Sequence, residues 1–266
     1  MSNITDTTPK SSETIVEKEM EAMKLEPIEE AASDQHTMNA STKPPSSAAS
    51  LNEKHPSALK TPIPYPVGGF KPEAQPCLSS EQQAMYDTLL ATVKEWKEIP
   101  SSTGKAGPTS DSEVMWLTRE CLLRYLRATK WSINEAAKRL LGTLSWRRDY
   151  GVEDLADGTT VSPENETGKL VLLGYDNEAR PCLYLSPGKQ NTQPSPRQVQ
   201  QLVFSIERAI ELMVPGQENL ALVVNFKQSK TRSNTAPGIS QGREVLNILQ
   251  THYPERLGRA YIINGM

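Results

Sequence analysis

The stretch "LNILQTHYPERLGRAYIIN", Leu246–Asn264, holds the end of one predicted helix and the start of one predicted strand. Its first half, with the residue before it, repeats apolar side chains every three or four positions, which is the period of one helix face. These side chains are Val245, Leu246, Ile248 and Leu249, followed by His252. Pro254 disfavours a helical backbone at the residue before it, so we expect the helix to end at Tyr253 and a short buried strand to cover Ala260–Ile263. A helix leading into a buried strand predicts an α/β layer.

Glu255 is the unusual residue of this junction, because a helix C-terminus favours cations rather than acids. Helix stability therefore does not explain it. One interpretation is a binding group, and the other is a surface ion pair with Arg256 or Arg259 that contributes well under about 1 kcal/mol. From the residues alone, the surface ion pair is preferred.

Composition excludes several classes of protein. The formal net charge of the 266 residues is -3, and no basic run is interleaved with aromatic residues, so nucleic acid is not an expected partner. The three cysteines show no CxxC spacing, which argues against a disulfide framework or a zinc cluster and fits a reducing compartment. Signal-peptide features and apolar runs of membrane-spanning length are not found, so we expect any membrane contact to be peripheral.

The chain divides into a tail and two folded parts. Residues 1–76 contain half of the 20 prolines and no aromatic residue before Tyr65, so we expect a disordered tail and linker. Residues 77–155 are predicted to form a helical subdomain. Its three helices are expected from Ser79 or Ser80, over Glu113–Thr129, and from a capping box at Ser132 to a C-cap at Gly151. The breaker between the first two contains Gly104-Lys105 but lacks the Walker spacing, so it is interpreted as a linker.

Residues 156–266 are predicted to form an α/β lobe. Lys169–Gly188 indicates two strands joined at Asp176-Asn177, and Ser195-Pro196 predicts the N-cap and first residue of a helix that ends at Pro215. The apolar run Asn219–Phe226 is typical of a strand covered on both faces. The order strand, strand, helix, strand, helix, strand favours a mostly parallel sheet flanked by helices.

Enzymatic chemistry has little support in the sequence. There is no GxSxG, HExxH or glycine-rich dinucleotide pattern, and no cofactor or metal site is predicted. A nucleophile pair of Cys182 and His252 is the remaining catalytic candidate, although a buried structural cysteine is the more common case.

Several blocks of the sequence resemble one family. "THYPERLGRAYIIN", "LLRYLRATKW" and "EVLNILQTHYPERLG" are similar to signatures of the CRAL-TRIO lipid-binding family, and in particular to its fungal phosphatidylinositol transfer proteins. Within that group the chain most resembles the phosphatidylinositol- and sterol-binding branch linked to azole tolerance. The resemblance runs from about Ser110 to the last residue. It implies a helical subdomain followed by a CRAL-TRIO lobe whose sheet and helices shelter the acyl chains of a lipid.

The resemblance also implies a headgroup site. It places Lys130 among residues that bind a phosphoinositide headgroup, and Glu255 among residues that accept hydrogen bonds from inositol hydroxyls. Thr129 stands where a better-known family member has arginine, and Ala179 stands where the family usually has glycine, so a phosphate contact and a turn are expected to differ. The implied partners are phosphatidylinositol, a sterol or other second lipid, a transient membrane surface and a lipid kinase, with a cytoplasmic location.

Three functions are compatible with the sequence. The first is non-enzymatic binding and transfer of phosphatidylinositol between membranes, the second is a regulatory module that binds another protein, and the third is an enzyme of unknown type. The chain stops at Met266, directly after its predicted strand, whereas family members continue. We therefore expect a C-terminally truncated, incomplete lobe with uncovered apolar faces, and a non-functional fragment of a transfer protein is a further alternative.

Overall fold

A computed structural model of the chain describes residues 63–66, 68–227 and 239–264. Most of the predicted tail, and residues 228–238 of the polar loop after Lys227, lie outside the described residues. The segment over residues 68–79 runs without helix or strand to the first described helix, α2. Before it, the hydroxyl of Tyr175 donates to the carbonyl oxygen of Pro64 at 2.8 Å, which fixes residues 63–66 beside the end of β3 (Leu170–Tyr175).

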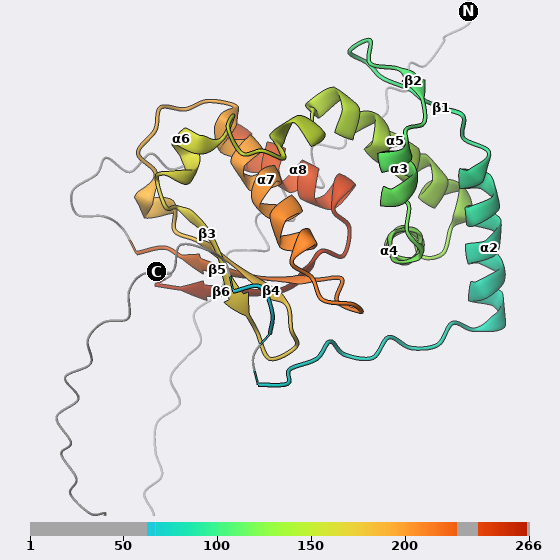
Figure 1. Cartoon of the computed structure of the whole chain (residues 1–266), viewed down its shortest axis with the longest axis horizontal. Helices are drawn as coiled ribbons and strands as arrows, with labels where there is room; N and C mark the ends of the chain where they lie inside the picture. Colours follow the sequence, from blue (N-terminus) through green and yellow to red (C-terminus); the bar gives the residue numbers. More distant parts are fainter. Residues whose placement is uncertain (1–62, 67, 228–238, 265–266) are drawn as a thin grey trace, which may run out of the picture. The chain divides into compact units, whose positions relative to one another are not determined.

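The helical subdomain contains α2 (Ser80–Lys94), α3 (Asp111–Trp116), α4 (Arg119–Ala128) and α5 (Ile133–Tyr150) (Figure 1). Helix α2 starts with a capping box in which Ser79 and Gln82 satisfy each other's backbone N–H groups. One core joins α2, α4 and α5, and each fully buried leucine in it stabilises the fold by about 1.5 to 3 kcal/mol. Its leucines include Leu89, Leu122, Leu126 and Leu140.

The prediction of one helix over Glu113–Thr129 was wrong. The helix breaks at Leu117, and Thr118 starts α4 by accepting a hydrogen bond from the backbone N–H of Cys121 at 3.2 Å. The predicted capping box of α5 does not form either, because the Ser132 side chain makes no capping hydrogen bond. The C-cap at Gly151 is confirmed by its left-handed φ of 75°.

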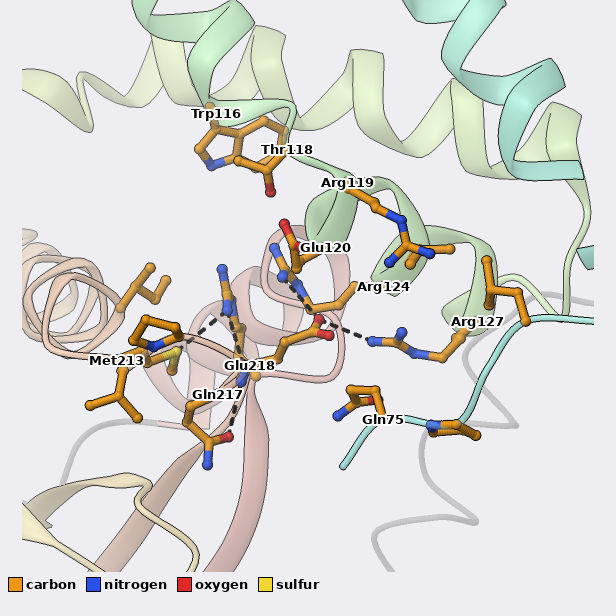
Figure 2. A pocket seen from close by; sticks show the side chains of 18 of the residues that line it. Gln75, Trp116, Thr118, Arg119, Glu120, Arg124, Arg127, Met213, Gln217 and Glu218 are labelled. Atoms are coloured by element: carbon orange, nitrogen blue, oxygen red, sulfur yellow. Dashed lines mark hydrogen bonds and ion pairs between the residues drawn. The ribbon is translucent and has the colours of Figure 1, made fainter. Parts of the chain in front are cut away.

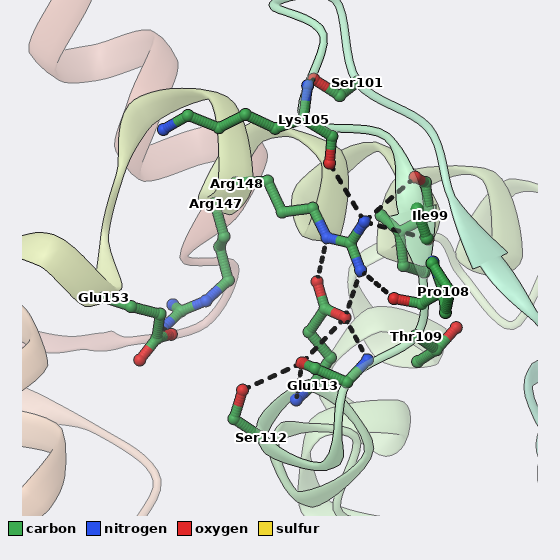
Figure 3. A network of polar contacts seen from close by, with 12 residues as sticks. Ile99, Ser101, Lys105, Pro108, Thr109, Ser112, Glu113, Arg147, Arg148 and Glu153 are labelled. Atoms are coloured by element: carbon green, nitrogen blue, oxygen red, sulfur yellow. Dashed lines mark hydrogen bonds and ion pairs between the residues drawn. The ribbon is translucent and has the colours of Figure 1, made fainter.

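The breaker between α2 and α3 is a small folded hairpin. Strand β1 (Glu98–Ile99) pairs antiparallel with β2 (Gly107–Pro108), and Arg148 of α5 holds the hairpin in place (Figure 3). The Arg148 guanidinium pairs with the Glu113 carboxylate and donates to four backbone carbonyl groups, which belong to Ile99, Lys105, Gly107 and Pro108. A segment interpreted from sequence as a linker is therefore fixed to the helical subdomain.

The lobe is built on a four-stranded sheet in the order β3-β4-β5-β6. Strands β3 (Leu170–Tyr175) and β4 (Pro181–Leu185) form the predicted antiparallel hairpin, while β5 (Leu220–Asn225) and β6 (Leu257–Ile263) add in parallel. The prediction of a mostly parallel sheet with helices is confirmed. Ala179, in the β3–β4 turn, has a left-handed φ of 59°, a conformation that favours the glycine usual in the family.

Helices α7 (Arg197–Glu211) and α8 (Ile239–His252) lie on one face of the sheet (Figure 1). They share a second core with Leu172 of β3 and Leu222 of β5. A short helix, α6 (Ser162–Asn165), and turns of 3-10 helix at Glu153–Leu155 and Pro187–Lys189 complete the lobe. Trp146 and Tyr150 of α5 also pack into this second core, so the two parts share contacts across the predicted boundary. The domain limits at residues 76 and 155 therefore stay a prediction.

Two local predictions in the lobe were wrong. The Ser195 side chain does not cap α7, which begins at Arg197 after Pro196. Strand β6 is longer than predicted and is exposed along its whole length, with Ile262 67% exposed, because it is an edge strand among the described residues. Its apolar sequence had predicted a buried strand.

Candidate functional site

Glu255 lies in the tight connection between α8 and β6. Helix α8 ends at His252, one residue before the end predicted from Pro254, and Glu255 takes a left-handed backbone conformation with φ of 57°. The side-chain amide of Asn219 donates to the Glu255 carbonyl oxygen, and the N–H of Leu220 donates to the carbonyl of Arg256 at 2.8 Å. These bonds from the start of β5 fix the connection at the edge of the sheet from which β5 and β6 begin.

A chain of ion pairs joins Glu255 to the helical subdomain. Arg127 of α4 donates from Nε to Glu255 at 2.6 Å and from Nη2 to Glu218 at 3.1 Å, and Arg124 donates to the same Glu218 oxygen at 3.1 Å. Burial opposes the charge of Arg127, but the hydrogen bond to Glu255 and the charge of Glu218 raise its pKa above the usual value. The Glu255 carboxylate is therefore held by a partner that sequence reasoning had not named, and neither Arg256 nor Arg259 is that partner.

Lys130 lies just beyond the C-terminal end of α4. Its φ is 52° and that of Trp131 is 65°, so two consecutive residues adopt the left-handed conformation and end the helix. The Lys130 N–H donates to the carbonyl oxygen of Arg127 at 3.0 Å, while its side chain is exposed. Lys130 and Glu255 are thus brought together by Arg127, which contacts Lys130 through the backbone and Glu255 through the side chain.

One face of the sheet carries an apolar row that helices α7 and α8 do not cover. Val171, Tyr184, Val223 and Tyr261 stand side by side in the register of the four strands. Val171 is 41%, Tyr184 39% and Tyr261 44% exposed, although apolar residues of this size are usually buried in a sheet. A contiguous exposed apolar patch is typical of a surface that binds a partner or a ligand.

The remaining catalytic candidate does not assemble. Cys182 is buried in β4 and its Sγ lies 3.7 Å from the carbonyl oxygen of Arg180. His252 stacks on Trp146 with ring centroids 4.1 Å apart, and its Nδ1 lies 3.1 Å from the hydroxyl oxygen of Thr143. The two residues therefore have separate structural partners, and burial raises the pKa of the Cys182 thiol.

Arg127, Glu218 and Asn219 were missed in the sequence. For Arg127 the sequence holds one local signal. Arg124 and Arg127 are three residues apart, so they share one side of α4, and their neighbours on the helix are mostly apolar, which directs both side chains toward the protein. Their partner Glu218 is more than 90 positions away in the sequence, and no spacing rule predicts that contact.

The fold and the site define a two-part α/β protein in which a helical subdomain is joined by ion pairs to a lobe. Among the described residues, one apolar face of the lobe's sheet is left uncovered by α7 and α8. Residues 85–142 match the CRAL/TRIO N-terminal domain and residues 165–265 match the CRAL/TRIO domain. The chain belongs to the CRAL-TRIO family. Within the described residues, the helices are too short or too polar to cross a membrane.

Fungal proteins are among the relatives. The chain is 56% identical over 207 residues to a CRAL-TRIO domain-containing protein of Schizosaccharomyces pombe, in a match covering 76% of this chain and 20% of the relative. It is 46% identical over 166 residues to the phosphatidylinositol transfer protein PDR17 of Saccharomyces cerevisiae, covering 59% of this chain and 47% of PDR17. The chain thus spans less than half the length of these relatives. The crystal structure of Sfh5 shares the fold, with a TM-score of 0.53 and 15% identity over 72% of this chain and 73% of Sfh5.

Proposed function

We propose that the chain binds a phospholipid, phosphatidylinositol, against the open sheet face and carries it between membranes without enzymatic chemistry. The observation that carries this proposal is the apolar row from Val171 to Tyr261, which lies in register across four strands and is left uncovered by α7 and α8. Each acyl methylene sheltered from water on such a face contributes about 0.8 kcal/mol. The similarity to PDR17, which is named as a phosphatidylinositol transfer protein, supports the choice of lipid.

The headgroup would be bound at the corner formed by Lys130 and Glu255. Arg127 occupies one oxygen of the Glu255 carboxylate, so the other oxygen is available to accept a hydrogen bond from an inositol hydroxyl. The exposed ammonium of Lys130 supplies a charge for the phosphate. Arg127 then acts as a positioning residue, since its guanidinium fixes the Glu255 carboxylate.

The proposal extends to a wider role. A sterol or other second lipid would use the apolar row without needing the headgroup corner. The protein would work in the cytoplasm, touch membranes transiently, and deliver phosphatidylinositol to a lipid kinase in support of phosphoinositide balance.

The experiment is native mass spectrometry of the chain after exposure to vesicles of phosphatidylinositol and phosphatidylcholine. We expect phosphatidylinositol on the unaltered protein, and at least a tenfold loss in the double variant Lys130→Ala, Glu255→Gln, because a charge-assisted hydrogen bond contributes about 1.5 to 3 kcal/mol. Lys138→Ala, which removes an exposed lysine of α5, is the matched control and should change nothing.

A third variant separates the two halves of the proposal. Tyr261→Asp places a charge on the open face and should abolish uptake of every lipid. Unchanged uptake by the double variant would reject the headgroup site alone. Unaltered protein that takes up no lipid would reject the function and favour a module that binds another protein.

A further inference from the structure

A cavity of about 810 Å³ lies between the two parts of the protein, away from the open sheet face. It is bounded by the start of α4, by the connection from α7 to β5, and by residues 75–78 of the extended segment (Figure 2). None of its lining residues belongs to the four strands of the sheet. Its volume is that of a small-molecule site, which is usually about 300 to 1,000 Å³.

Most charges around this cavity are neutralised within the protein. Glu218 pairs with Arg124 and Arg127, as Figure 2 shows. Glu207 pairs with Arg147 at 2.8 Å and accepts a hydrogen bond from Tyr253 at 2.6 Å. What remains in the lining is Arg256, together with two exposed residues at the start of α4, Arg119 and Glu120.

Arg256 is a largely buried cation that has no carboxylate partner among the described residues. Its Nη1 donates to the carbonyl oxygen of Glu218 at 2.9 Å and lies 3.5 Å from the sulfur of Met213. Burial, and then the nearby charge of Arg124, lower its pKa to about 10. The other edge of the guanidinium, Nε and Nη2, has no hydrogen-bond partner in the described part of the chain. Two parallel N–H groups of this kind match the two oxygens of a carboxylate.

Much of the remaining cavity wall is apolar, and the rest carries uncharged polar side chains such as those of Gln75, Gln82 and Gln217. The apolar side chains include Trp116, Trp131, Leu123, Ile210 and Met213. Helix α4 begins here at Thr118, and the positive end of its dipole faces the same space. One unpaired cation beside an apolar wall suits a ligand with one negative charge and an apolar body.

We propose that this cavity binds an apolar monocarboxylic acid, with the carboxylate on the free edge of Arg256 and the body between Trp116 and Trp131. None of the sheet strands lines this cavity, and it shares only Arg127 with the proposed headgroup site, so the proposal does not depend on lipid transfer.

The test is a calorimetric titration of the full chain with 2-naphthoate and with the uncharged 2-naphthalenemethanol. We expect the acid to bind at least tenfold more tightly than the alcohol, and Arg256→Gln to remove that difference. In nuclear magnetic resonance spectra, 2-naphthoate should shift the indole N–H signals of Trp116 and Trp131, while those of Trp96 and Trp146, outside the lining, stay in place. Equal binding of acid and alcohol, or shifts spread over all four tryptophans, would overturn the proposal.

Two exposed variants keep the test decisive if Arg256→Gln does not fold. Glu120→Gln removes a repelling charge from the cavity lining and should tighten 2-naphthoate about two- to threefold at low salt, while Arg119→Gln should weaken it by a similar factor. No effect of either variant would count against the site. Tyr261→Asp should leave 2-naphthoate binding intact, which separates failure of this proposal from failure of the lipid proposal.

Discussion

Replacing Glu218 by glutamine should destabilise the protein by about 3 kcal/mol. The Glu218 side chain is 7% exposed and that of Arg124 is 6%, and a single Glu218 oxygen accepts from Arg124 and Arg127 at 3.1 Å each. Removing one partner of a buried ion pair costs about 3 to 5 kcal/mol, because the other charge is left without compensation. The lower end applies here, since Arg127 is partly exposed and keeps its bond to Glu255.

Urea denaturation measures this change. With a slope of about 2 kcal/mol per molar urea, the midpoint of Glu218→Gln should fall by about 1.5 M. Three of the four tryptophans, Trp96, Trp116 and Trp131, pack against the core of the helical subdomain, so most of the fluorescence reports on that part, while Trp146 also contacts the lobe. Circular dichroism reports on both parts. In the variant the two signals should separate, because the ion pairs that join the parts are weakened.

The matched control is Glu211→Gln, which removes an exposed carboxylate paired with Arg208 on the same helix. Exposed pairs contribute roughly 0 to 1 kcal/mol, so this variant should shift the midpoint by no more than about 0.5 M. If Glu218→Gln moved the midpoint no further than Glu211→Gln does, the buried ion pairs would not be what joins the two parts.

Three further outcomes are expected. Burial beside Trp146 lowers the pKa of His252 from 6.5 to about 4, so the folded state holds the proton less tightly. Stability should be full above pH 6.5 and fall as the pH drops to 4. The loss should be about 1 to 2 kcal/mol, below the roughly 3 kcal/mol of the full shift, because the ring is partly exposed to solvent. A His252→Phe variant should lose that slope in thermal melts. Arg148→Met should remove the guanidinium donor from four carbonyl groups and raise hydrogen exchange in β1 and β2, while exchange in α8 stays unchanged. Gly151→Ala should lower the free energy of unfolding by about 1 kcal/mol or more, because the φ of Gly151 is 75° and a Cβ would lie 2.8 Å from Asp154 Oδ2. Gly142→Ala is the control: this glycine lies in the middle of α5, an added Cβ would meet no atom within 4 Å, and the variant should raise the free energy of unfolding by about 0.5 to 1 kcal/mol in the same urea assay.

Local patterns in the sequence predicted most of the elements. The capping residues at Ser79 and Gly151, the proline after α8 and the strand-helix order each act over a few residues, and the fold retains them. The break at Thr118 escaped prediction because the apolar spacing continues across it from Leu117 to Cys121, which hides a new N-cap. The exposure of β6 was not predicted, because an apolar sequence shows only that a strand could be buried. Whether it is buried depends on the strands and helices beside it, and β6 is an edge strand among the described residues.

The candidate site was predictable only in part. Family resemblance pointed to Lys130 and Glu255, and the fold brings both to Arg127. Arg127 itself, Glu218 and the free edge of Arg256 depend on contacts between residues tens of positions apart, which the sequence alone does not encode in any spacing.

The separate core of the helical subdomain has a consequence for how the chain folds during synthesis. Its contacts join α2, α4 and α5, which are close in the sequence, whereas the parallel pairs of the sheet and the bonds from Arg124 and Arg127 to Glu218 span far longer loops. Local contacts form faster, and the N-terminal part leaves the ribosome first. The helical subdomain should therefore be in place before β5 emerges, with its two arginines unpaired, and the arrival of Glu218 should complete the joint between the parts last.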